Sequence, residues 1–182
     1  MNKIFILFSL VSVLTFGQEN YNFQIVNNQL EWQYVYETEM TKSEIEGLLK
    51  SNGIFKNLSI NENLITGNIE NISADYKGAG KTLMGTSFYV LNSTINGFFM
   101  FEFKDGKYRI SLNGINLRTT NESSYGVISI ASANAINPLS AYVIKNSKLR
   151  NVFLSNGDAK IYNHTFYTLF DFSKYQIKTT DW

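Results

Sequence analysis

Residues 98–112 read FFMFEFKDGKYRISL and predict a β-hairpin. The turn is Asp105-Gly106, a pair typical of a two-residue type I′ turn, because that turn needs a positive φ at both central residues. Such a turn places Lys104 opposite Lys107, and the pairing then continues back along both strands. The expected partners are Phe103 with Tyr108, Glu102 with Arg109, Phe101 with Ile110, and Met100 with Ser111.

This register predicts two unlike faces, since side chains alternate across a strand. One face is apolar and is expected to form the core under the helices: Phe99, Phe101, Phe103, Tyr108, Ile110 and Leu112. The other face is charged near the turn, with Glu102 and Arg109, and apolar further in, with Phe98 and Met100. We expect the C-terminal segment or a second layer to cover Phe98 and Met100. The alternative is an exposed binding surface made of Phe98, Met100, Glu102 and Arg109.

Alternation of apolar and polar residues predicts further strands on both sides of this hairpin. Residues 23–26 and 30–36 form a first hairpin about Asn27-Asn28. The other expected strands are residues 55–60, 64–72, 88–91 and 125–130, and the long hairpin strands span 95–104 and 107–112. The stretch 139–153 fits a strand or a helix equally well.

Two helices are expected. The first starts at a capping box, with Thr41 as N-cap and Glu44 three residues later, and Gly53 is placed for a left-handed C-cap. The last spans residues 158–172, with Asp158 as N-cap and one apolar face made of Tyr162, Phe166, Leu169 and Phe170. Helices this few cannot connect parallel strands. The expected class is therefore α+β, an antiparallel sheet with helices packed on one face.

The N-terminus is typical of a signal peptide. A short start with Lys3 is followed by an apolar run without charge, residues 4–16, and by the small residue Gly17. The run is shorter than the roughly 20 residues that a membrane-spanning helix needs. We therefore expect residues 1–17 to be removed on export and residues 18–182 to form a single domain. A lipid anchor would need a cysteine, so we expect a periplasmic or secreted protein that is not a lipoprotein.

Composition limits the chemistry. The chain has 16 Lys and Arg against 15 Asp and Glu and no basic run, so a nucleic-acid partner is not expected. With no cysteine there is neither a disulfide nor a cysteine nucleophile. The single histidine, His164, cannot supply the two or three imidazoles of a usual catalytic zinc site, and no metal or cofactor is expected. We expect His164 to be a solvated surface residue on the last helix.

The segment Gly78-Ala79-Gly80-Lys81-Thr82 resembles the end of a phosphate-binding loop. The full motif needs a glycine where Asp75 stands, and its loop leads into a helix, whereas residues 82–90 are expected to be another strand. We expect residues 73–85 to form a loop that binds no nucleotide.

Two motifs carry a resemblance to a known family. They are Trp32-Gln33-Tyr34-Val35-Tyr36-Glu37-Thr38, followed by a capped helix, and the hairpin segment 101–109. Over residues 26–118 the chain resembles the uncharacterised domain of exported Bacteroidetes proteins described as having a TATA-binding-protein-like (TBP-like) fold. The resemblance implies a curved antiparallel sheet with helices on one side and an exported location. It implies no activity.

These observations favour a non-enzymatic binding or interaction module of the bacterial cell envelope, which uses the open sheet face or the loop 73–85. The alternative is a small envelope hydrolase, whose carboxylates would converge only in the folded chain. A structural subunit of a larger assembly is a third possibility, and it would show a large apolar patch and self-association. The ligand or partner is not identifiable from the sequence.

Overall fold

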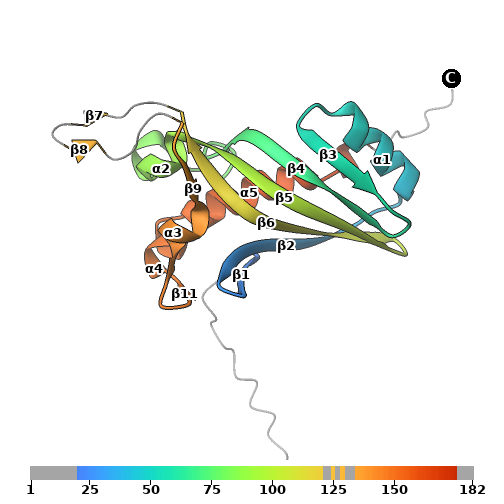
Figure 1. The fold of residues 1–182 in the computed structure, drawn as a ribbon, viewed down its shortest axis with the longest axis horizontal. Helices are drawn as coiled ribbons and strands as arrows, with labels where there is room; N and C mark the ends of the chain where they lie inside the picture. The colour runs from blue at the N-terminus through green and yellow to red at the C-terminus, as the bar shows by residue number, and fades with distance from the viewer. Residues whose placement is uncertain (1–19, 121–123, 126–127, 130–133, 176–182) are drawn as a thin grey trace, which may run out of the picture.

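An antiparallel sheet dominates the computed structural model, which describes residues 20–120, 124–125, 128–129 and 134–175 (Figure 1). Within these residues the sheet has seven strands, six of them in the order β1-β2-β6-β5-β4-β3. The seventh strand, β9, pairs with residues 116–118 of β6, past the residues 107–112 that pair with β2. The strands are β1 (Phe23–Val26), β2 (Gln29–Glu37), β3 (Phe55–Ile60), β4 (Leu64–Ser73), β5 (Ser93–Lys104), β6 (Lys107–Thr119) and β9 (Ile136–Pro138).

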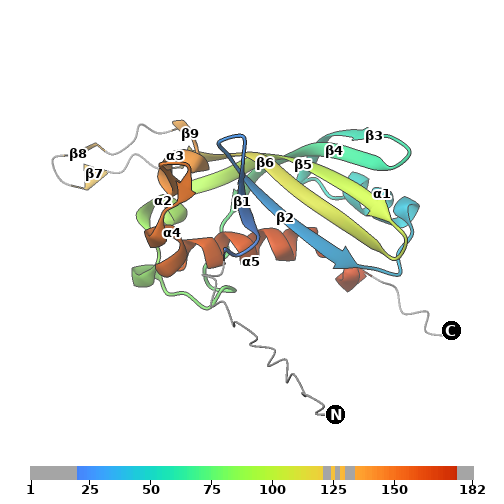
Figure 2. The same ribbon diagram turned by 90° about the horizontal axis from the view of Figure 1, so that it is seen from below.

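The helices lie to one side of this sheet, and α5 runs along its face (Figure 2). They are α1 (Lys42–Ser51), α2 (Phe88–Leu91), α3 (Leu139–Val143), α4 (Asn151–Ser155) and α5 (Asp158–Phe170), with short 3₁₀ turns η1 (Leu83–Gly85) and η2 (Ser173–Tyr175). Two small hairpins complete the described elements: β7 (Ser124–Tyr125) with β8 (Ile128–Ser129), and β10 (Ile144–Lys145) with β11 (Lys148–Leu149). The predicted α+β class, with an antiparallel sheet, is confirmed. None of the described helices is both long and apolar enough to cross a membrane.

The β5–β6 hairpin has the predicted register. Lys104 pairs with Lys107, Phe103 with Tyr108, Glu102 with Arg109, Phe101 with Ile110 and Met100 with Ser111. The turn type is different, because Gly106 takes a positive φ of 71° while Asp105 does not. The two-residue loop length, which is as predicted, sets the pairing here, so the register does not depend on a type I′ turn.

The core lies between the sheet and α5. Trp32, Phe99, Phe101, Ile110 and Leu112 have no exposed surface, and α5 contributes the buried Tyr162, Phe166 and Phe170. Of the apolar face predicted for α5, Leu169 is only half-buried. The hydroxyl of Tyr108 donates to the carbonyl of Phe170 (2.8 Å), and that of Tyr36 donates to the carbonyl of Tyr167 (2.9 Å). Strand tyrosines thus satisfy carbonyls in the last turn of α5, which have no partner within the helix.

Helix α1 starts as predicted and ends differently. The N–H of Glu44 donates to Thr41 Oγ1 (3.3 Å), and the N–H of Thr41 donates to Glu44 Oε2 (2.7 Å), which confirms the capping box. The left-handed C-cap predicted at Gly53 is wrong. The helix ends at Ser51, and Asn52 leaves it in an extended conformation with its Oδ1 accepting from the N–H of Ile54.

Helix α5 also differs from the prediction at both ends. Asp158 is not the N-cap but the first helical residue, because Gly157 occupies the cap position with a left-handed φ of 88°. The Asp158 carboxylate is instead engaged with side chains near α2. The helix ends at Phe170, two residues earlier than expected, although Phe172 beyond it is still buried.

Two further strand predictions need correction. Residues 88–91 form α2, and residues 82–90 contain η1 and the first three residues of α2 instead of a strand. The N–H groups of Val90 and Leu91 donate to the Ser87 carbonyl. Short apolar runs carry no periodicity that separates helix from strand. The predicted strand 125–130 is in its described part a hairpin of β7 and β8. The ambiguous stretch 139–153 holds α3, a small hairpin and most of α4. The predicted signal peptide, residues 1–17, lies outside the described residues.

Candidate functional site

The face of the sheet opposite α5, called the open face below, has none of the described helices over it (Figure 2). It carries the even-numbered side chains of β5, including the predicted Phe98, Met100 and Glu102, with Arg109 from β6. Phe98 is 41% exposed and Met100 is half-buried. The expectation that the C-terminal segment or a second layer covers Phe98 and Met100 is wrong for Phe98, which is exposed, and among the described residues α5 packs against the other face (Figure 2). The structure therefore brings the four predicted surface residues onto one accessible face.

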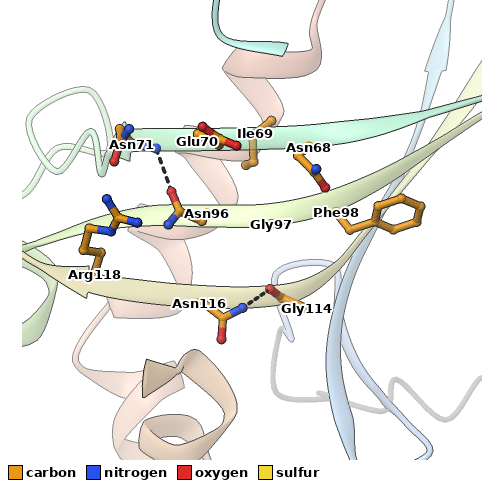
Figure 3. A pocket seen from close by; sticks show the side chains of 10 residues that line it. All are labelled: Asn68, Ile69, Glu70, Asn71, Asn96, Gly97, Phe98, Gly114, Asn116 and Arg118. Carbon is orange, nitrogen blue, oxygen red and sulfur yellow. Dashed lines mark hydrogen bonds between the residues drawn. The ribbon is translucent and has the colours of Figure 1, made fainter. Parts of the chain in front are cut away.

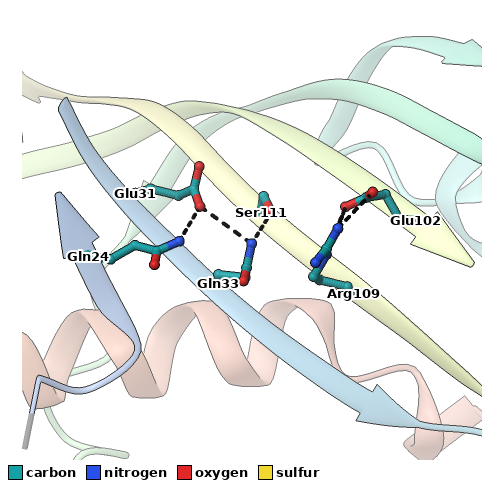
Figure 4. A network of polar contacts seen from close by, with 6 residues as sticks. All are labelled: Gln24, Glu31, Gln33, Glu102, Arg109 and Ser111. Atoms are coloured by element: carbon teal, nitrogen blue, oxygen red, sulfur yellow. Dashed lines mark hydrogen bonds and ion pairs between the residues drawn. The ribbon is translucent and has the colours of Figure 1, made fainter. Parts of the chain in front are cut away.

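Part of the open face is a row of polar contacts that crosses four strands (Figure 4). Arg109 forms a two-pronged ion pair with Glu102, with Nε 2.8 Å from Oε2 and Nη2 2.9 Å from Oε1. Next to it, Gln33 Nε2 donates to Ser111 Oγ (2.9 Å), and Glu31 accepts from Gln24 Nε2 (2.6 Å). Each side chain holds its neighbour in place, so this end of the face is an ordered polar surface.

Further along the same face lies a hollow of about 370 Å³, which we call the amide hollow (Figure 3). Two irregularities of pairing form it: one in β4 between Ile69 and Ile72, and one between β5 and β6 near Gly114, whose φ is 56°. Bulges of this kind bend a sheet and re-aim side chains. The polar side chains that line the hollow are Asn68, Glu70, Asn71, Asn96, Asn116 and Arg118, with Phe98 at one end.

Two amides of the hollow have fixed orientations. Asn96 Oδ1 accepts from the backbone N–H of Asn71 (2.7 Å), and Asn116 Nδ2 donates to the carbonyl of Gly114 (2.7 Å). A backbone N–H can only donate and a carbonyl can only accept, so neither amide can be reversed. Asn96 therefore presents its NH₂ group, and Asn116 presents its carbonyl oxygen.

Two polar atoms close to the hollow are buried without a hydrogen-bond partner among the described residues. They are Arg118 Nε and Thr94 Oγ1. Thr94 and Arg118 stand directly opposite each other on β5 and β6. A buried polar atom that lacks a partner is unfavourable, so this end of the face is not optimised for stability alone.

A second candidate region lies where the loop after β4 packs on α5. His164 Nε2 is 3.3 Å from Asp75 Oδ2, and the N–H of Gly78 donates to Asp75 Oδ1 (2.8 Å). The His164 side chain, predicted to be a solvated surface residue, is 33% exposed and is also engaged with Asp75. A side chain at Gly78 would collide with Asp75 and His164, which explains the glycine. Beside them is an open depression of about 630 Å³ that Tyr21, Lys160, Asn163 and Tyr167 also line.

The geometry of the segment 78–82 supports a structural role. Lys81 Nζ donates to the carbonyl of Asn156 (3.2 Å) just before α5, instead of pointing toward an open phosphate site. A phosphate-binding loop leads directly into a helix, whereas this segment leads into the three-residue 3₁₀ turn η1. The segment thus fastens the loop to the start of α5.

Asp158 carries the one carboxylate that is buried among the described residues. Its Oδ2 accepts from Ser87 Oγ (2.6 Å) and Tyr89 OH (2.7 Å), which ties α2 to α5. Burial, followed by the nearby Asp158 charge, raises the pKa of Tyr89. No group of three or more His, Cys, Asp or Glu suited to a metal ion occurs in the described part of the chain.

Comparison with known proteins concerns the fold alone. No protein-family model matches the sequence. No curated protein matches it. Among solved structures, the chain is similar to a TBP-like protein from Parabacteroides distasonis, with 15% sequence identity and a TM-score of 0.46. The similarity covers 83% of this chain and 90% of that chain. It assigns no ligand and no activity.

Sequence reasoning did not find the amide hollow. The predicted strand ended at Leu112, whereas β6 continues to Thr119 through the bulge at Gly114. The signal was present: Ile115 and Leu117 alternate with Asn116 and Arg118, shifted by one residue relative to the strand before Gly114. A shift of one in an alternating pattern is what a bulge produces.

Proposed function

We propose that this protein is an exported, non-enzymatic binding or interaction module of the bacterial cell envelope and that its open face is the binding surface. The observation that carries the proposal is the contrast at two neighbouring residues of β5. Phe99 has no exposed surface, whereas Phe98, next to the amide hollow, is 41% exposed. An exposed aromatic ring beside oriented polar groups is the usual make-up of a ligand site.

The ordered polar row supports the same proposal. Side chains that are already held by hydrogen bonds lose little conformational freedom when a ligand binds. The Glu102–Arg109 pair and the Gln33–Ser111 contact are such groups, and they adjoin the predicted Phe98 and Met100. The open face thus offers a prearranged surface rather than a flexible one.

A small envelope hydrolase remains the second candidate, and its supporting observation is the contact between His164 and Asp75. A histidine beside a carboxylate can act as a general base. No serine, threonine or tyrosine hydroxyl of the described residues is hydrogen-bonded to His164, and the buried Asp158 belongs to a different cluster. The binding proposal is therefore preferred.

The proposal can be tested by native mass spectrometry of the protein isolated from its own envelope. We compare the wild type with Phe98→Ala and with Val152→Ala, a control at an apolar residue of α4 that is 60% exposed and lies outside the open face. The wild type and the control should carry the same bound molecule or partner chain, and Phe98→Ala should lose it. An equal companion mass in all three proteins, or none in any of them, contradicts the proposal.

A further inference from the structure

Two neighbouring strands of the amide hollow each carry a fixed polar group, a donor on β5 and an acceptor on β6. Asn96 and Asn116 are cross-strand partners, so their Cβ atoms are about 5 Å apart. Asn96 presents an NH₂ group, Asn116 presents a carbonyl oxygen that points away from Asn96, and both amides are fixed by backbone contacts (Figure 3). A ligand that fits must accept at one point and donate at the next. Neighbouring hydroxyl groups do both, because each hydroxyl is a donor and an acceptor.

The charges of the hollow favour an uncharged ligand. Its charged lining residues are Glu70 and Arg118, one of each sign. An anion such as a phosphate would meet the Glu70 carboxylate, and a cation would meet the Arg118 guanidinium. A neutral ligand avoids both repulsions, and its oxygen atoms can accept from the guanidinium group of Arg118, which lines the hollow (Figure 3).

The apolar component of the hollow is an aromatic ring at one end. Phe98 lies there, two residues along β5 from Asn96 and on the same face (Figure 3). A sugar ring has an apolar C–H surface that packs on an aromatic ring and a polar rim of hydroxyls, so it matches this division. A peptide would instead need pockets for apolar side chains. The lining is mostly polar, and besides Phe98 its large apolar residue is Ile69, which is fully buried.

We propose that the amide hollow binds a neutral sugar chain, with Asn96 donating to one hydroxyl, Asn116 accepting from the next, and Phe98 contacting the C–H face of a ring. The volume of about 370 Å³ lies in the range of small-ligand pockets. This inference rests on the proposed function, since it names the ligand class of the open face.

The test uses the full mature chain on an array of neutral and anionic glycans, followed by titration calorimetry with the neutral oligosaccharide that binds best. The variant is Asn96→Asp, which keeps the oxygen that accepts from Asn71 and removes the NH₂ donor. The matched control is Asn52→Asp. Asn52 also accepts a backbone N–H, that of Ile54 (3.1 Å), but lies at the end of α1, outside the hollow.

We expect neutral glycans to bind the wild type, Asn52→Asp to bind equally well, and Asn96→Asp to bind about tenfold more weakly, as loss of one hydrogen bond predicts. Binding that is confined to anionic glycans, affinity unchanged by Asn96→Asp, or an array on which nothing binds overturns the inference. In that case the native mass spectra separate the two proposals. A Phe98-dependent companion that is not a sugar leaves the binding function intact, whereas no companion at all removes both.

Discussion

The two faces of the sheet are built from different interactions, although they share the same strands. On the covered face, aromatic rings pack on α5; for example, the ring centroids of Phe99 and Phe170 are 5.6 Å apart. On the open face, side chains bond mainly to one another, as in the Glu102–Arg109 pair. Burial of apolar area provides most of the stability of a domain, and exposed polar contacts provide little. The covered face therefore determines the fold, and the open face is available for binding.

The largest difference between the two faces is expected in the loss of stability caused by Phe99→Ala and by Phe98→Ala. Phe99 is fully buried, so its truncation should lower the free energy of unfolding by about 3–5 kcal/mol. Phe98 is 41% exposed, and its truncation should cost less than about 1 kcal/mol. Urea unfolding followed by circular dichroism measures both. Equal losses in the two variants would mean that the faces are not divided as described.

A polar group on the covered side should also matter more than an exposed one. Asp158→Ala leaves the partly buried hydroxyls of Ser87 and Tyr89 without their acceptor and should cost about 1–3 kcal/mol of unfolding free energy. Asp75→Ala is the control, since that carboxylate is 51% exposed and its contacts with His164 and with the N–H of Gly78 should together be worth about 1 kcal/mol or less. A larger loss for Asp75→Ala than for Asp158→Ala would show that the loop contact, not the buried cluster, holds α5 in place.

Alkaline pH should weaken the covered face selectively. Burial is the main cause that raises the pKa of Tyr36, Tyr108 and Tyr162 above the ordinary value of 10.0. Because each pKa is higher in the folded state than in the unfolded state, the free energy of unfolding is unaffected by these tyrosines below about pH 10. Above that pH it falls by about 1.4 kcal/mol per pH unit for each such tyrosine. Unfolding free energies measured across this pH range report the slope.

Tyr162→Phe isolates one of these contributions. The Tyr162 hydroxyl is buried and has no hydrogen-bond partner among the described residues, so its removal breaks no hydrogen bond there. The variant should be as stable as the wild type near neutral pH and should lose stability less steeply above about pH 10. An unchanged alkaline slope would indicate that Tyr162 is accessible to solvent.

The smallest effect is expected on the open face itself. Glu102 and Arg109 are 40% and 47% exposed, so a double-mutant cycle with alanine at both positions should give a coupling energy of about 0.2–1 kcal/mol. The coupling should decrease with added salt. A coupling of several kcal/mol would mean that the open face contributes to the fold as the covered face does.

The regular parts of the molecule were predictable from the sequence. The hairpin register followed from the length of the turn at Asp105-Gly106 and the alternation of its strands, and the start of α1 followed from Thr41 and Glu44. Both are local properties of a few neighbouring residues. They were sufficient to place Phe98, Met100, Glu102 and Arg109 on one face.

The amide hollow and the contacts of α5 were not predictable in the same way. The hollow depends on bulges that bring Asn71 of β4 next to Asn96 of β5, 25 residues later. Asp158 is held by Ser87 and Tyr89, about 70 residues earlier in the chain, and His164 by Asp75. Such contacts are set by tertiary packing, which local patterns do not encode.

Site-specific photo-crosslinking in the native envelope tests the open face as a binding surface most directly. A benzophenone side chain placed at position 98 lies beside the amide hollow, and one placed at position 152 is exposed on α4 away from it. Our account predicts a discrete adduct from position 98, reduced by Asn96→Asp, and none from position 152. A discrete adduct from position 152 with none from position 98 would contradict it.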